Sequence, residues 1–345
     1  MIITRTPLRV SFCGGGTDFP AWFTGHGGAV VSVVIDKYCY ISCRELPPFF
    51  EYKSRFVWSK IESVNALSQI EHPAIKGCLK FLRLDDPHLQ VHHDGDLPAQ
   101  SGTGSSASFT VGLLHALHSL RGNLVSKRLL AHEAIIVNQD VMEETVGCQD
   151  QVAAAFGGLN LIKFGPGKHD FTVEPLALSN NVYAKLSSHL MLFYTNHSRE
   201  SSKIEQAKQG RNNDSILTQQ AALVDQCVDA LATGDMQVLG GLLSDSWVLK
   251  SNMAPEVSNR FLADCYGRAM LAGAYGCKVT GAGGGGCLLL VVPPNKQVAV
   301  KQALSDLVYI PFKFDYQGSQ LIYYQPSGGR FNLADHTPPG TVVNI

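Results

Sequence analysis

The sequence has no surplus of charge of either sign, because 28 Lys and Arg residues stand against 29 Asp and Glu residues. A balanced chain exerts no broad electrostatic attraction on nucleic acid or on an anionic membrane surface. We therefore expect neither kind of partner, and any anionic ligand has to be held by local groups.

Long apolar runs, paired cysteines and a targeting segment are also missing. Apolar runs such as 287–292 are far too short to span a bilayer. The nine cysteines are odd in number and form no CxxC pair, and the start MIITRTPLRV lacks the residue order of a signal peptide. These absences favour a cytoplasmic protein with reduced thiols and no membrane span. The sequence is compatible with a homodimer.

What the chain does contain is the composition of a globular protein with many tight turns: 45% apolar residues, 33 glycines and 16 prolines. Its 345 residues exceed the usual size of a single hydrophobic core, so we expect two lobes or one elaborated domain. The stretch 165–181, rich in Gly, Pro, Ser and Asn, is interpreted as the connection between lobes 1–180 and 181–345.

Both halves alternate apolar strand patterns with helical patterns, but without strict βαβ order, which predicts an α+β fold. The expected strands lie at 9–12, 29–35, 38–44, 158–164 and 190–194, and the expected helices at 105–120, 127–143 and, with interruptions near 212 and 234, 200–249.

The segment LPAQSGTGSSAS places small residues and hydroxyls between a predicted strand and a predicted helix. Backbone N–H groups and the positive end of a helix dipole can there face one anion, such as a phosphate chain. Gly102 and Gly104 allow a ligand to come close, and Ser105 and Ser106 offer hydroxyls to phosphate or to a divalent metal.

This loop has three other interpretations. No lysine follows the glycines, so the loop is not a Walker A motif. Gly102, Gly104 and Ala107 satisfy the dinucleotide pattern G-x-G-x-x-A, but the acidic residue expected about 20 positions later is missing. A plain turn before a serine-capped helix remains open from this segment alone.

Three ordered segments change the weight of these alternatives. The string 98–107, PAQSGTGSSA, resembles the central phosphate-binding motif of the GHMP kinases, while TPLRVSFCGGGTDF and KVTGAGGGGC resemble that family's first and third motifs. The phrases GGGTDFPAWF, VGCQDQVAAAFGG and PFKFDYQGSQL are similar to the branch that phosphorylates D-glycero-α-D-manno-heptose 7-phosphate. Fucose and related sugar kinases share these motifs.

The resemblance implies a two-lobed α+β fold, with an N-terminal lobe like domain 2 of ribosomal protein S5 and a ferredoxin-like C-terminal lobe. It implies transfer of the ATP γ-phosphate to the anomeric oxygen of the heptose phosphate, in nucleotide-activated heptose and surface-polysaccharide biosynthesis. It places ATP on residues of this loop, namely Pro98, Ser101, Gly102, Thr103, Gly104, Ser105, Ser106 and Ala107.

By the same resemblance, Asp150 lies beside the attacking hydroxyl as base or orienter, and Arg9 stabilises both that carboxylate and the transferred phosphate. Asp18 is expected to hold a pair of sugar hydroxyls. Other residues expected at the sugar are Gly14, Gly15, Gly16, Thr17, Gly283, Gly284 and, for a phosphate at carbon 7, Arg199.

The family usually carries a Glu that binds Mg²⁺ together with the second serine of the loop. Twelve positions before Asp150 this sequence has Asn138, so Ser106 and Asn138 are the predicted metal ligands, without the usual charge. A catalytically silent sugar sensor on the same scaffold is the alternative that this departure suggests.

Overall fold

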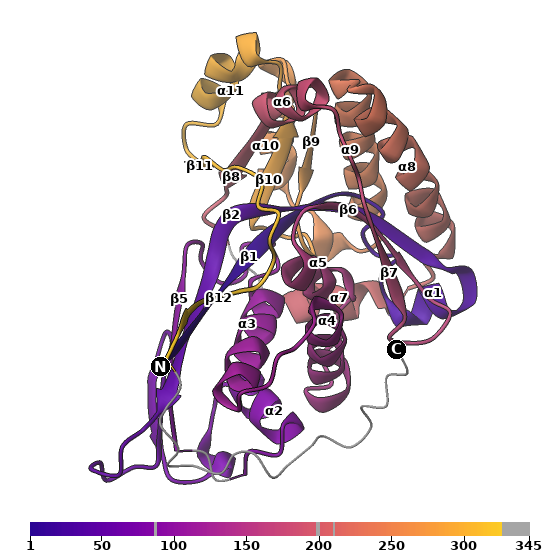
Figure 1. The fold of residues 1–345 in the computed structure, drawn as a ribbon. Coiled ribbons are helices and arrows are strands. Elements are labelled where there is room, and N and C mark those ends of the chain that lie inside the picture. Colours follow the sequence, from indigo (N-terminus) through magenta and orange to yellow (C-terminus); the bar gives the residue numbers. More distant parts are fainter. Residues whose placement is uncertain (86–87, 198–200, 210, 326–345) are drawn as a thin grey trace.

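The computed structural model describes residues 1–85, 88–197, 201–209 and 211–325. It has two lobes, each built from one sheet and its covering helices (Figure 1). The expected mixed α+β architecture is confirmed.

The first lobe is organised around a sheet of eight described strands. Their main order is β12-β1-β2-β5-β3-β4, with β6 paired to β2 and β7 paired to β6. All neighbours are antiparallel except β3 and β5. The strands are β1 (Ile2–Cys13), β2 (Gly28–Glu45), β3 (Ser54–Val57), β4 (Ile61–Val64), β5 (Leu89–Gly95), β6 (Leu159–Phe164), β7 (Phe171–Pro175) and β12 (Gln320–Tyr324).

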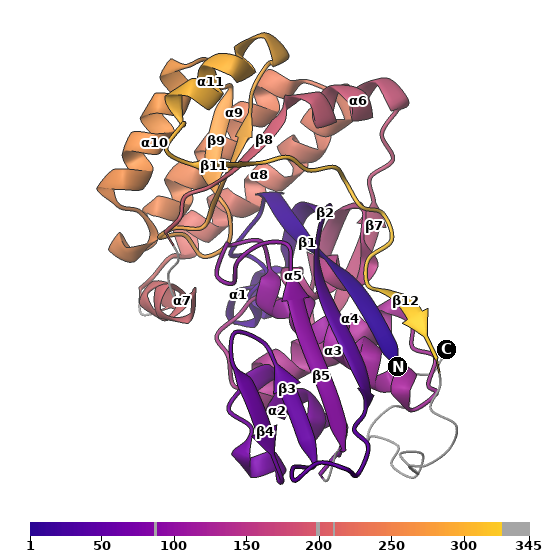
Figure 2. The ribbon, with the colours of Figure 1, turned by 90° about the vertical axis from the view of Figure 1, so that its left-hand side faces the viewer.

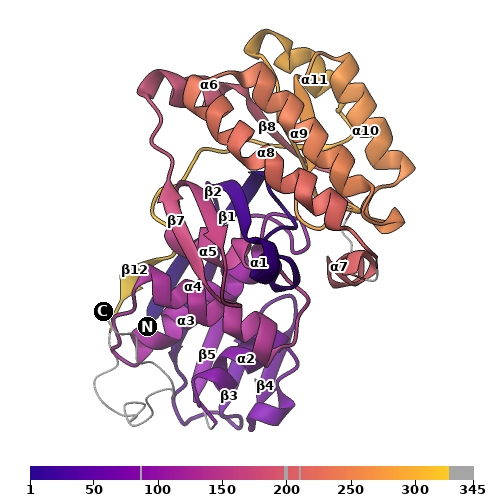
Figure 3. The same cartoon turned by 90° about the vertical axis from the view of Figure 1, so that its right-hand side faces the viewer.

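Four helices cover one face of this sheet, which Figure 2 shows from the strand side and Figure 3 from the helix side. They are α2 (Pro73–Phe81), α3 (Ser105–Leu120), α4 (Lys127–Ile136) and α5 (Gln149–Phe156). The short α1 (Pro20–His26) follows β1. A largely antiparallel sheet with helices on one face is not the doubly wound parallel sheet that a dinucleotide motif requires.

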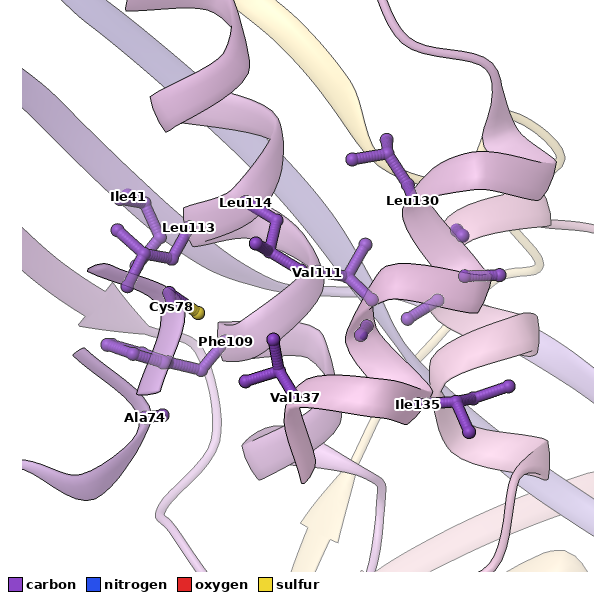
Figure 4. Packing of buried hydrophobic residues seen from close by; sticks show 14 of the residues in the cluster. Ile41, Ala74, Cys78, Phe109, Val111, Leu113, Leu114, Leu130, Ile135 and Val137 are labelled. Carbon is purple, nitrogen blue, oxygen red and sulfur yellow. The ribbon is translucent and has the colours of Figure 1, made fainter. Parts of the chain in front are cut away.

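The core of the first lobe explains why α3 forms where the sequence predicts it. Its apolar residues Phe109, Val111, Leu113 and Leu114 are buried between the sheet and the neighbouring helices (Figure 4). Gly112 allows the helix to approach β1 closely, because a Cβ there would lie 2.8 Å from the Thr6 hydroxyl oxygen. Its carbonyl accepts a hydrogen bond from the Thr4 hydroxyl at 2.9 Å. Helix α3 is therefore fixed firmly enough to position its N-terminus.

The second lobe is a four-stranded sheet, in the order β11-β8-β10-β9, between two layers of helices. Alternate β8 residues point to opposite layers: Leu190 and Leu192 pack with α8 and α9, Met191 and Phe193 with α10 and α11. The strands are β8 (Leu190–Tyr194), β9 (Gly276–Val279), β10 (Cys287–Val291) and β11 (Val308–Ile310). The helices are α6 (Asn180–His189), α7 (Ser201–Gln209), α8 (Asp214–Thr233), α9 (Met236–Ser251), α10 (Arg260–Leu271) and α11 (Gln297–Ala303).

The structure refines several expected elements. The strands predicted at 29–35 and 38–44 form the single long strand β2, because β1 pairs with it on both sides of a register shift between Pro7 and Leu8. The predicted lobe connection contains the strand β7, which pairs with β6. After the second lobe the chain returns, and β12 pairs with β1 in the first sheet. Residues 320–324 thus belong to the first sheet rather than to the second.

None of the helices within the described ranges is both long enough and apolar enough to cross a membrane.

Candidate active site

A cleft of about 320 Å³ lies between the two lobes. Its first-lobe wall comes from the end of β1 and the turn that follows, the glycine loop before α3, and the start of α5. Its second-lobe wall comes from α7, α9 and the segment after β9. Segments far apart in the sequence therefore meet at one site.

The glycine loop leads into the N-terminus of α3, and this helix end is suited to binding an anion. Gly104, the residue before α3, has left-handed backbone angles (φ 79°, ψ 25°) and no side chain caps the first turn. The first backbone N–H groups of the helix are then available to a ligand. Ser105, Ser106 and Ala107 line the cleft in this first turn, and Ser106 is exposed to it.

The loop is fixed by the second lobe. The backbone N–H of Cys287 donates to the carbonyl of Ser101 at 2.9 Å. A Cβ on Gly102 would lie 2.7 Å from the carbonyl oxygen of Thr280, and one on Gly281 would lie 2.6 Å from the Cα of Gly102. Only glycine permits this approach, so the second and third predicted motifs form one backbone contact between the lobes.

Arg9 joins the glycine loop to Asp150. Its Nε donates to Asp150 Oδ1 at 2.7 Å, its second terminal nitrogen lies 2.6 Å from the same oxygen, and its first donates to the carbonyl of Gly102 at 2.7 Å. Arg9 is 4% exposed, whereas the Asp150 side chain is 27% exposed. The arginine is therefore a buried support, and the carboxylate that it holds faces the cleft.

Asp18 is a second carboxylate on the cleft wall, and it is buried. Its oxygens accept hydrogen bonds from the backbone N–H groups of Gly16 at 3.0 Å and Gln149 at 3.2 Å. Burial, and after it the negative charge of Asp150, raises the pKa of Asp18 to about 6. Asp18 and Asp150, predicted from separate motifs, therefore influence each other across one site.

The other predicted residues of the glycine loop support it or lie outside the cleft lining. Buried Ser101 and Thr103 share a hydrogen bond of 2.7 Å between their hydroxyls, and the Thr103 carbonyl accepts from the backbone N–H of Arg9 at 2.9 Å. Pro98 is exposed and does not line the cleft.

The predicted sugar residues divide in the same way. Gly15 and Gly16 line the cleft, while the buried Thr17 hydroxyl closes the turn by donating to the carbonyl of Gly14 at 2.8 Å. Residues 283 and 284 of the late glycine cluster pack against Val257 outside the cleft lining. Residue Arg199 lies outside the described residues.

Asn138 lines the cleft, but its side chain is already engaged. Its Nδ2 donates to Glu144 Oε2 at 2.9 Å, and its Oδ1 lies 3.2 Å from Gln151 Nε2. Glu144 also lines the cleft, and sequence reasoning missed it. Glu144 lies six positions after Asn138. That spacing puts two side chains on different faces of a regular α-helix, so no periodic signal connects them.

Three lysines of the second-lobe wall, Lys208, Lys250 and Lys278, were also missed. Lys250 and Lys278 are buried, and neither forms an ion pair with a carboxylate of the described chain. Burial lowers the pKa of Lys250 well below its usual value, and it lowers that of Lys278 to about 8. The available signal was the lysine in Gly276–Val279, a strand whose residues are otherwise buried and uncharged.

The comparison with known families agrees with this geometry. The GHMP kinase N-terminal domain matches residues 73–158, which include the glycine loop and Asp150, and the GHMP kinase C-terminal domain matches residues 227–310. The N-terminal domain match lies in the first lobe and the C-terminal domain match in the second. This chain belongs to the GHMP kinases.

Similar proteins support a kinase that acts on sugars. This GHMP kinase is 29% identical over 319 residues to D-glycero-alpha-D-manno-heptose 7-phosphate kinase of Campylobacter jejuni, covering 88% of this chain and 93% of that protein. It is 27% identical over 344 residues to the galactokinase of Pyrococcus furiosus, covering 88% and 92%. The chain is thus an ATP-dependent sugar kinase.

A solved structure shows the same fold. The crystal structure of a D-glycero-D-manno-heptose 1-phosphate kinase from Bacteriodes thetaiotaomicron matches this GHMP kinase with a TM-score of 0.77. The match covers 94% of this chain and 100% of that one, at 23% identity.

Proposed function

We propose that this GHMP kinase transfers the γ-phosphate of ATP to the anomeric hydroxyl of D-glycero-α-D-manno-heptose 7-phosphate, giving the 1,7-bisphosphate. The observation that carries the proposal is Asp150, held by Arg9 beside the anion-binding start of α3 and facing the cleft. The product would supply nucleotide-activated heptose for surface polysaccharide.

The roles follow from what phosphoryl transfer requires, namely alignment, charge neutralisation and a proton acceptor. ATP phosphates would lie on the backbone N–H groups of 102–107. The anomeric oxygen attacks the γ-phosphorus, its proton passes to the Asp150 carboxylate, and the bond from the γ-phosphorus to the bridging oxygen breaks to release ADP. Arg9 stabilises the Asp150 carboxylate and the negative charge of the transferred group.

Asp18 would fix the sugar by accepting hydrogen bonds from two of its hydroxyls. Its own backbone donors, Gly16 and Gln149, hold the carboxylate in one orientation. A carboxylate held in this way can accept bonds from neighbouring hydroxyls without losing side-chain entropy on binding.

A phosphorylated rather than a neutral sugar is favoured by the second-lobe wall. Lys250 and Lys278 are buried lysines that line the cleft without a carboxylate partner among the described residues. Burying unpaired charge costs free energy, and an anionic substrate group would offset that cost on binding. These lysines therefore take the place that Arg199 has in the sequence prediction.

The family also uses a divalent cation, and the donors of this cleft fit Mg²⁺. Ser106 supplies a hydroxyl oxygen and Glu144 a carboxylate oxygen on the same cleft, which are hard ligands of the kind that Mg²⁺ takes. The cation would neutralise phosphate charge of bound ATP.

The test is a panel of sugars with product analysis. Heptose 7-phosphate, heptose, mannose and fucose are compared at saturating ATP by ADP release, and ³¹P NMR locates the new phosphate. We expect phosphate at carbon 1 and a kcat/KM for heptose 7-phosphate at least about tenfold above that for mannose, the scale of one charge-assisted contact.

A catalytically impaired variant gives the background rate of ADP release in this assay. Asp150→Asn should lower kcat by about a hundredfold or more, the scale of a lost general base, while sugar binding persists. Equal efficiency on mannose and heptose 7-phosphate would remove the phosphate from the proposal, and near-normal turnover of Asp150→Asn would remove the base.

A further inference from the structure

We propose that Glu144 is the carboxylate that this chain directs at the divalent cation of bound ATP, and that Asn138 is the residue that positions it. The inference rests on the ATP-dependent chemistry and the Mg²⁺ proposed above. It gives the metal site a negatively charged ligand, which the predicted pair Ser106 and Asn138 lacks.

The backbone brings Glu144 back to the cleft. Helix α4 ends at Ile136, and a wider π-type turn, Val137–Val141, follows. The N–H of Met142 then donates to the carbonyl of Val137, and the N–H of Glu144 donates to that of Asn138, each at 2.9 Å. Such turns insert an extra residue into a helix and change the direction of the chain beyond them. The turn therefore reverses the chain so that residue 144 lies beside residue 138.

The side-chain amide of Asn138 holds the carboxylate of Glu144 in place. Asn138 is buried, and its Nδ2 donates to Glu144 Oε2 at 2.9 Å. Glu144 is half-buried, and within the described ranges no lysine, arginine or histidine pairs with it and no hydrogen bond reaches Oε1. A carboxylate that is partly desolvated and has no cation is incompletely compensated. A metal ion at Oε1 would supply the missing positive charge.

The other acidic residues of this region either pair with cations or lie outside the cleft lining. Asp140 forms an ion pair with Lys168 and does not line the cleft. Glu143 is exposed and does not line the cleft either. Asp150 is held by Arg9. Glu144 is thus the carboxylate of segment 137–149 that shares the cleft with Ser106.

The test separates a metal-directed carboxylate from a structural one by measuring nucleotide affinity in two conditions. Calorimetry gives the Kd of a non-hydrolysable ATP analogue with saturating Mg²⁺ and with EDTA, in wild type, Glu144→Gln and the matched exposed control Glu143→Gln. No sugar is present, so the result does not depend on the identity of the acceptor.

We expect Glu144→Gln to weaken binding with Mg²⁺ by about tenfold or more, the scale reported for groups that support a metal site. The same variant should bind at least as tightly as wild type in EDTA, because a negative charge facing the phosphates has been removed. Glu143→Gln should match wild type in both conditions.

A double variant that exchanges the two side chains tests whether positions 138 and 144 both face the cation. In Asn138→Glu combined with Glu144→Gln, the carboxylate moves to position 138 and the amide to position 144, and the Mg²⁺-dependent gain in affinity should return. The inference is overturned if Glu144→Gln keeps the wild-type Mg²⁺ dependence, or if it weakens binding equally with Mg²⁺ and with EDTA.

Discussion

At the scale of single residues, the site depends on how a few charges are compensated. Asp150 is paired with the buried Arg9, whereas Asp18 has only backbone donors and lies near the charge of Asp150. Two carboxylates in one cleft thus have different environments, which is how a protein assigns them different roles.

The raised pKa of Asp18 gives a pH dependence that can be measured. With its pKa at about 6, Asp18 loses its ionised form as the pH falls through 6, and the protonated carboxyl accepts hydrogen bonds from sugar hydroxyls less well. We expect sugar affinity, measured by calorimetry between pH 5 and 8, to weaken below about pH 6 while ATP affinity stays constant.

The variant Asp150→Asn provides the internal control. Removing the neighbouring charge should lower the pKa of Asp18, so the inflection moves to lower pH, whereas the titration of a sugar phosphate itself does not move. An inflection that stays in place would show that Asp18 is not the titrating group.

The same shift has a consequence for stability. The folded-state pKa of Asp18 lies above the ordinary value of about 4 for an unfolded chain. Its contribution to stability is therefore fully present below pH 4 and is lost as the pH rises through 6. At neutral pH the ionised sugar anchor costs folding free energy.

At the scale of elements, the contact between the glycine loop and the turn after β9 decides where the start of α3 lies. Gly286 has φ of 93°, and a Cβ there would lie 2.6 Å from the Ser101 carbonyl oxygen. That carbonyl accepts from the N–H of Cys287 and helps to hold the loop.

Gly286→Ala should therefore separate the loop from the second lobe. We expect a loss of about 2 kcal/mol or more in the free energy of unfolding, from the strained φ and the displaced carbonyl, together with weaker ATP binding. Thermal melting and calorimetry with an ATP analogue measure the two effects.

A matched control lies on α9. A Cβ on Gly241 meets no atom within 4 Å and the residue is helical, so Gly241→Ala should raise stability by about 0.4–1 kcal/mol without changing ATP affinity. Equal behaviour of the two variants would contradict the role of the loop contact.

At the scale of the whole molecule, the two lobes share one apolar core. The C-terminal part of β1 and the N-terminal part of β2 pack directly on α8 and α9 of the second lobe (Figure 3). The buried ammonium group of Lys278 donates to the carbonyl of Phe12 across the same boundary at 2.7 Å. The shared residues include Leu8, Val10, Phe12, Val31, Val33, Leu223, Leu231, Leu239 and Leu243.

This shared core predicts cooperative unfolding. Separating the lobes would expose the apolar faces of both, and that cost couples their stabilities. We expect one calorimetric transition, coincident with the loss of near- and far-UV circular dichroism. Two resolved transitions would mean that the lobes unfold independently.

Local patterns were sufficient for much of this protein. The strand and helix periods, the glycine loop before α3 and the family motifs are all carried by short stretches of sequence, and the structure confirms the mixed fold that they predict. The motifs also contain Arg9, Asp18 and Asp150, which meet at one cleft. Their chemistry is set by residue type and immediate neighbours, both of which can be read along the chain.

Only the tertiary structure decided the rest. Lys250 and Lys278 reach the cleft because α9 and β9 pack against the first lobe, and Glu144 reaches it because a π-type turn reverses the chain after Asn138. β12 returns to β1 from the far end of the described chain. These contacts join residues that no period or motif relates, since they arise from burial and chain direction in three dimensions.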